Sequence, residues 1–145
     1  MGLGSKESIL ENIATELEKI TVANGYANDI QQVDRQFDAP EEGNYKYPSI
    51  FVNDRDEQRV QLLKDLFRVV LTVGLVLYVY DEGGTLGTSI NSFIEDTKKA
   101  LLADITRGGQ ARNTTITRIL VDASLVTPPS AGIIMLCEVE YYDSD

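Results

Sequence analysis

A chain of 145 residues with 43% hydrophobic and 25% charged residues is expected to form one globular domain. It has no histidine and a single cysteine, Cys137, which excludes Ser–His–Asp and Cys–His nucleophiles and zinc sites of the Cys/His type. Its net charge of −10 disfavours a surface that grips nucleic-acid phosphates. Only carboxylate chemistry stays open to an enzyme, so we expect no catalytic, cofactor or metal site.

An amphipathic helix is predicted at the start of the chain. Its apolar residues recur at three- and four-residue steps, namely Ile9, Leu10, Ile13, Leu17 and Ile20. Ser5 is placed to cap the first turn, and Asn24-Gly25 fits the left-handed stop that follows many helices. The polar N-terminus predicts no secretory leader.

Two short strands are predicted next, one alternating through Val33, Arg35 and Phe37 and one over residues 47–52. Pro48 suits the start or the edge of a strand because it cannot donate a ladder hydrogen bond. The charged stretch over residues 53–64 is expected to form a loop or a short helical turn.

The apolar stretch that ends at Tyr80 is predicted to be a long strand, because it is rich in β-branched and aromatic residues. Both of its faces are mostly apolar, so both are expected to be covered. Its length suggests that part of it projects beyond the sheet. The run from Val69 to Tyr80 is too short to span a bilayer as a helix, so no membrane association is expected.

A second amphipathic helix and two strands complete the predicted fold. The helix carries Leu86, Ile90, Phe93, Ile94, Leu101 and Ile105 on one face, and Gly108-Gly109 is expected to end it. The strands are predicted over 115–125 and 133–142, with a frayed tail at 143–145. The order α-β-β-β-α-β-β predicts a single α+β domain over residues 1–145, with two main helices packed on a mostly antiparallel sheet.

Two loops offer weak motifs, and a plain structural interpretation is favoured for each. The segment 81–88 lies between a strand and a helix, as phosphate loops do, but it lacks the Gly-Lys-Ser/Thr ending and has two carboxylates at its entry. The acids at 54–57 lack the spacing of an EF-hand loop. A turn and a solvated segment are therefore expected, and Cys137, within an apolar run, is expected to be a buried thiol.

Charged segments and tyrosines are the candidate interface residues, with solvation, a structural turn and sheet packing as the plainer alternatives. Opposite charges across an interface set register, and tyrosine is enriched at interfaces. The candidates are Asp54, Arg55, Asp56 and Arg59 in the first charged segment, Arg107 and Arg112 after the second helix, and Tyr78, Tyr80 and Tyr141 on the strands.

The order of these segments resembles the tail terminator (tail completion) proteins of long-tailed bacteriophages. The features that carry the resemblance are the first helix ending at Asn24-Gly25-Tyr26, the strand with Val33 and Arg35, the Pro-flanked strand over 47–52, the long strand, the helix over 92–101 and the last strand closing in Glu140-Tyr141-Tyr142. They span nearly the whole chain, although no single motif is diagnostic.

The resemblance implies a homo-oligomer, a hexameric ring at the head-proximal end of the tail in the virion, assembled in the host cytoplasm. Such a ring stops polymerisation of the tail tube protein and joins the head-side connector or neck protein, and DNA passes through it without specific binding. The acidic composition and the lack of a catalytic set agree with this role. There are two alternatives. One is another phage neck or tube-associated protein, and the other is a soluble small-molecule or regulatory binding domain.

Overall fold

The computed structural model describes residues 5–35, 46–122 and 130–144. Its helices and strands follow the predicted order and confirm the α+β class. They are α1 (Lys6–Glu18), β1 (Gln32–Asp34), β2 (Ser49–Leu63), β3 (Leu66–Tyr80), α2 (Leu86–Leu102), β4 (Asn113–Asp122) and β5 (Ser130–Asp143), with a short 3₁₀ helix, η1 (Val22–Asn24), after α1.

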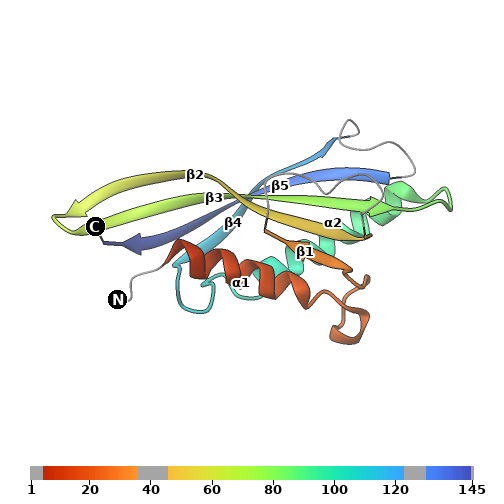
Figure 1. Cartoon of the computed structure of the whole chain (residues 1–145), viewed down its shortest axis with the longest axis horizontal. Helices are drawn as coiled ribbons and strands as arrows, with labels where there is room; N and C mark the ends of the chain where they lie inside the picture. The colour runs from red at the N-terminus through yellow and green to blue at the C-terminus, as the bar shows by residue number, and fades with distance from the viewer. Residues whose placement is uncertain (1–4, 36–45, 123–129, 145) are drawn as a thin grey trace.

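The five strands form one twisted sheet in the order β1-β2-β3-β5-β4. β1 runs parallel to β2, and all other neighbours are antiparallel. Both helices lie against the same side of this sheet (Figure 1). The molecule is therefore a two-layer arrangement with one side of the sheet facing the helices and the other side facing away from them.

The core lies between the helices and alternate residues of β3 and β5. Leu71, Leu75 and Leu77 are fully buried on the helix side of β3, as the two-residue period of a strand requires. They belong to the same core as Ile13 of α1 and Phe93 of α2. Burying one such side chain contributes roughly 1.5–3 kcal/mol, so this layer supplies most of the stability of the domain.

The expectation that both faces of β3 would be covered was wrong for part of the face that points away from the helices, on which Gly74 and Tyr78 are nevertheless buried. Val70, Thr72 and Val76 point away from the helices and are only half-buried, and no helix or strand among the described residues lies over them. Val76 lies between Phe51 of β2 and Ile134 of β5, so neighbours within the sheet cover part of its surface. An apolar pattern on both faces of a central strand can therefore arise from flanking side chains.

The expectation of a loop or helical turn over residues 53–64 was also wrong, because this stretch forms most of β2. It pairs with β3 from Ser49↔Tyr78 to Leu63↔Leu66, and residues 64 and 65 make the turn. Hydrogen bonding to an apolar neighbouring strand outweighs the low strand propensity of the charged residues. The β2–β3 hairpin extends past the start of α1 (Figure 1).

Several boundaries differ from the predictions. α2 ends at Leu102, so Ile105 lies beyond it and is exposed. Gly25 does take the left-handed conformation, with φ of 89°, but it caps η1 and not α1. Asp143 pairs with Phe67 and therefore belongs to β5, not to a frayed tail. Ser5 caps α1 as predicted, accepting a hydrogen bond from the Ser8 amide.

The predictions for Phe37, for the connection after it, and for the end of the strand at residue 125 fall outside the described residues.

Candidate assembly surfaces

Arg107, predicted to lie on an exposed contact loop, is instead buried in the protomer. Its exposed fraction is 0%, and its guanidinium donates hydrogen bonds to the backbone carbonyls of Leu101 and Asp104. It adopts a left-handed backbone conformation, with φ of 51°. The Arg107 side chain therefore caps the C-terminal end of α2, because the last carbonyls of a helix need hydrogen-bond donors. It is not available as a surface contact in the protomer.

The three tyrosines do not form one surface patch either. Tyr78 and Tyr141 are 4% and 2% exposed and lie on opposite sides of the sheet. The Tyr141 hydroxyl donates a hydrogen bond to Glu57 Oε1 at 3.0 Å. Tyr80 is exposed, and its ring lies 5.5 Å from that of Tyr47. Strand parity places Tyr141 on the side opposite Tyr78 and Tyr80, and Tyr78 is buried, so only Tyr80 stays a surface candidate.

The charged residues of β2 have distinct partners. Asp54 forms a 2.7 Å ion pair with Lys6 of α1, which holds the pKa of that carboxyl below its usual range. Arg59 forms a 2.9 Å ion pair with Asp143. Arg55 occupies a bulge between Asp54 and Asp56 in the pairing with β3. Asp56 has no ion-pair or hydrogen-bond partner among the residues that the structure describes.

Gly74 of β3 leaves room for Arg55. A Cβ at position 74 would lie 2.2 Å from Arg55 Nε and 2.8 Å from Asn53 Oδ1. The Arg55 side chain therefore folds back across the sheet over this glycine and does not extend from the edge. Sequence reasoning had no signal for this arrangement, because the two residues are brought together only by strand pairing.

Two edges of the described sheet have no described partner strand over most of their length, and the sequence pattern did not indicate them. β1 pairs only with residues 49–51 of β2, so no described strand pairs with the outer edge of β2 over residues 52–63. The outer edge of β4 is likewise unpaired with any described strand over Asn113–Asp122. Free edges present unsatisfied backbone donors and acceptors, which readily accept another strand.

Exposed apolar side chains occur at both ends of the sheet. Leu63, at the hairpin turn, is 68% exposed, and Val60 is 48% exposed. On β4, Leu120 and Val121 are 42% and 51% exposed. Leu63 pairs with Leu66, whereas Val121 lies level with Leu77, so about 36 Å of strand separates the two groups. They lie toward opposite ends of the long axis (Figure 1).

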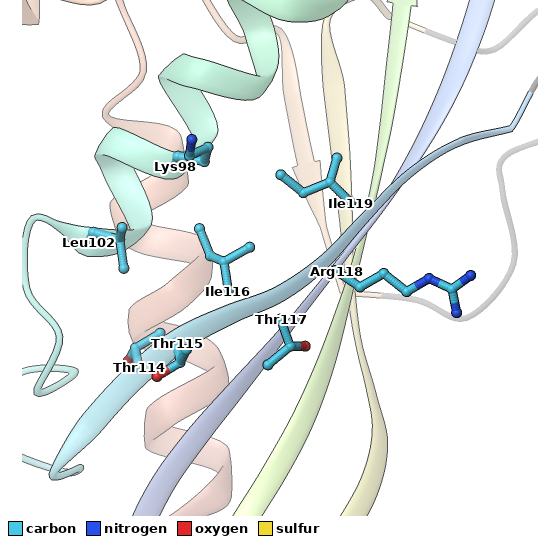
Figure 2. A pocket seen from close by; sticks show the side chains of 8 residues that line it. All are labelled: Lys98, Leu102, Thr114, Thr115, Ile116, Thr117, Arg118 and Ile119. Carbon is cyan, nitrogen blue, oxygen red and sulfur yellow. The ribbon is translucent and has the colours of Figure 1, made fainter.

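A groove of about 620 Å³ lies between α2 and β4. Ile116 and Ile119 of β4 point toward Leu102 and Lys98 of α2, whereas the Arg118 guanidinium points to the other side of the strand (Figure 2). Arg118 is exposed and has no ion-pair or hydrogen-bond partner in the described part of the chain. Arg112, just before β4, is exposed and contacts the Tyr142 ring and hydroxyl.

Residues 81–85 form a turn, as expected, and α2 begins at Leu86. Asp81 accepts hydrogen bonds from the Ser89 hydroxyl at 2.6 Å, the Thr85 hydroxyl at 2.7 Å and the Gly83 amide at 2.7 Å. These bonds lower the pKa of the Asp81 carboxyl. A carboxylate thus lies at the start of α2, and its negative charge disfavours a phosphate there.

Cys137 is buried in the core, as predicted, and gives a direct test of that burial. Removal from water raises the pKa of its thiol to about 12. At about pH 8 the folded protein is expected to react with Ellman's reagent at least about 1,000-fold more slowly than the urea-unfolded chain, since the thiolate is the nucleophile. Complete labelling of the folded protein within the mixing time would show that the thiol is accessible.

Among residues 5–35, 46–122 and 130–144, no group of three or more Cys, Asp or Glu side chains is arranged to hold a metal ion. In the same ranges, no helix has the length and apolar character needed to cross a membrane.

No protein-family model matches the chain, and no curated protein sequence matches it.

Proposed function

We propose that the protein is a structural subunit of a phage tail, a tail-terminator-like protein that assembles as a ring on the head-proximal end of the tail tube. There it stops polymerisation of the tube protein and offers a joining surface to the head-side connector or neck protein. The order and lengths of the secondary-structure elements, which resemble those of tail terminators over nearly the whole chain, first suggest this role.

The observation that carries the proposal is that the described sheet has two different edges without a partner strand, one along residues 52–63 of β2 and the other along β4. A contact between two different surfaces of the same protomer is heterologous, and it closes into a ring when the rotation between neighbours divides a full turn. The exposed apolar residues at the hairpin turn and on β4 add surface that a monomer would leave in water. Both features suit a subunit that is completed by its neighbours.

The charge of the chain also supports this role. A ring that DNA crosses must not hold the polyanion, and 23 acidic against 13 basic residues give such a ring a repulsive surface. The basic side chains are further restricted, because Arg107 is buried and Lys6, Arg35 and Arg59 are each paired with a carboxylate.

Light scattering after size exclusion tests the ring directly. The parent protein is expected to show, at high concentration, a species with six times the 16.1 kDa mass of the chain. Leu63→Glu is expected to keep the parent's melting temperature, since the Leu63 side chain is exposed. A contact between the hairpin turn and the tail tube predicts that this variant binds tubes more weakly than the parent. A strictly monomeric parent at all concentrations, with no density on tail tubes, would contradict the proposal.

A second candidate is a small-molecule or regulatory binding domain, favoured by the groove between α2 and β4. Its volume of about 620 Å³ is within the range of ligand sites, and its lining combines Ile116, Ile119 and Leu102 with the amine of Lys98. This alternative predicts a stable monomer whose melting temperature rises with one class of small molecule, and no effect of tail tubes.

A further inference from the structure

We infer that neighbouring copies of this chain join edge to edge, with β4 of one copy pairing antiparallel to the free part of β2 of the next copy. Arg118 of one copy then contacts Asp56 of the next. The inference rests on the proposed function only for the number of copies in the ring, because it assigns the surface through which any two copies bind.

Backbone hydrogen bonding is the first argument. The outer edges of β4 and of residues 52–63 of β2 are the two long edges of the described sheet that lack a partner strand. Neither edge contains proline, and proline is one of the common devices that prevent edge pairing. With the two copies level, residues 113–119 of β4 pair with residues 52–58 of β2, which satisfies donors and acceptors of both edges over that length. Residues 120–122 lie level with residues 49–51, whose outer edge β1 occupies, so they stay outside the pairing.

Strand direction is the second argument. β2 and β5 run in one direction, and β3 and β4 run in the other, because each neighbouring pair in β2-β3-β5-β4 is antiparallel. If the next copy keeps the same orientation along the strands, its β2 lies antiparallel to β4 of the first copy. The alternation within the sheet then continues from one copy to the next.

The level alignment of two copies, with no shift along the strands, brings complementary residues together. Arg118 lies in the same row as Leu136, Gly74 and Asn53, whereas Asp56 lies in the row of Thr72, two residues along β3. Arg118 of one copy and Asp56 of the next are then diagonal neighbours on the same side of the sheet. Diagonal positions are about 7–8 Å apart, within reach of an arginine side chain.

Charge is the third argument. Arg118 is the one charged side chain of β4 that the structure describes, and it has no ionic partner within the described residues. Asp56 is the acid of β2 that likewise lacks a partner, since Asp54 is paired with Lys6 and Glu57 accepts from Tyr141. Each unpaired charge on one edge therefore meets the opposite charge on the other edge.

The same charges disfavour the symmetric alternatives. Pairing β4 with a second β4 about a two-fold axis brings two Arg118 side chains toward each other, and pairing β2 with β2 does the same to Asp56. Like charges facing each other across an interface destabilise it. The heterologous β4–β2 contact is the arrangement that avoids both repulsions, and it is the type that closes into rings.

Charge exchange tests the Arg118–Asp56 contact. Arg118→Asp and Asp56→Arg are each expected to raise the concentration needed for half-assembly by about tenfold or more at low salt, because each change places like charges together. The double variant is expected to restore assembly toward the parent value. The control is Glu18→Lys, an exposed charge change on α1. If the four variants melt at the same temperature as the parent, a change in assembly is not caused by a loss of folding.

A disulfide trap tests the pairing itself. Gln58 and Asn113 lie in the same row, across Val70 and Glu140, and so are three strand spacings or about 14 Å apart within one copy. A disulfide joins Cα atoms no more than about 7 Å apart, so the double variant Gln58→Cys, Asn113→Cys can cross-link only between copies. We expect it to give covalent multimers under mild oxidation. The control pair, Glu18→Cys with Asn113→Cys, is expected to give none.

The outcomes separate this inference from the proposed function. If the parent assembles but neither charge exchange nor the cysteine pair behaves as expected, the edge-to-edge contact is wrong and the ring stands. If the cysteine pair cross-links and charge exchange restores assembly, yet tail tubes stay uncapped, the contact stands and the tail function is wrong. A parent that never self-associates overturns the inference.

Discussion

Replacing Leu75 by aspartate is expected to abolish folding. Leu75 is fully buried at the centre of β3, on the side that faces the helices. The change removes a packed side chain, which alone costs about 2–5 kcal/mol, and it also buries a carboxylate without a partner. Together these losses approach the whole stability of a typical domain, about 5–15 kcal/mol. Circular dichroism should show no cooperative thermal transition.

Leu63→Asp is the matched control, because it makes the same chemical change at an exposed leucine of the hairpin turn. Its melting temperature is expected to lie close to that of the parent, since no buried surface is lost. Asp143→Ala should also have a small effect, since it removes one half-exposed ion pair with Arg59. A Leu75→Asp melting curve that coincides with the parent curve would show that β3 is wrongly placed.

Replacing Arg107 by alanine is expected to destabilise the domain by about 2–4 kcal/mol, because it empties the space of a fully buried side chain and leaves the buried Leu101 carbonyl without this donor. The Asp104 carbonyl loses its side-chain donor but keeps the backbone amide of residue 107. For a domain of this size the loss corresponds to a fall of roughly 10 °C in melting temperature. Differential scanning calorimetry measures it directly.

The left-handed conformation of Arg107 allows the backbone and side-chain contributions to be separated. Glycine tolerates a φ of 51° without steric cost, so Arg107→Gly should be about 1 kcal/mol more stable than Arg107→Ala while staying below the parent. Arg112→Ala serves as the surface control, since Arg112 is exposed. If Arg107→Ala and Arg112→Ala melted together at the parent temperature, the buried cap would have no role in stability.

The sequence pattern predicted the parts of the fold that periodicity governs. Ile9, Ile13 and Leu17 at helical steps, and the apolar stretch ending at Tyr80, correspond to α1 and β3. The turn after Asp81 and the burial of Cys137 were also predicted correctly, because short-range hydrogen bonding and an apolar run determine them.

The missed features depend on contacts between distant segments. Residues 53–64 form a strand because β3 offers a long pairing edge, which their charged composition does not reveal. Arg107 is buried because the end of α2 needs donors, whereas the same sequence, Arg-Gly-Gly, is typical of an exposed loop. The free edges of β2 and β4 depend on the strand order of the whole sheet, which spacing along the chain does not determine.

Electron microscopy of tail tubes tests the central proposal most directly. The proposed function predicts that phage tail tubes assembled without this protein grow without a length limit. With the parent protein they should end in a ring-shaped density at the head-proximal end. The Arg118→Asp variant should leave tubes uncapped at protein concentrations at which the parent caps them. Tubes that remain bare with an excess of the folded parent protein would contradict the proposed function.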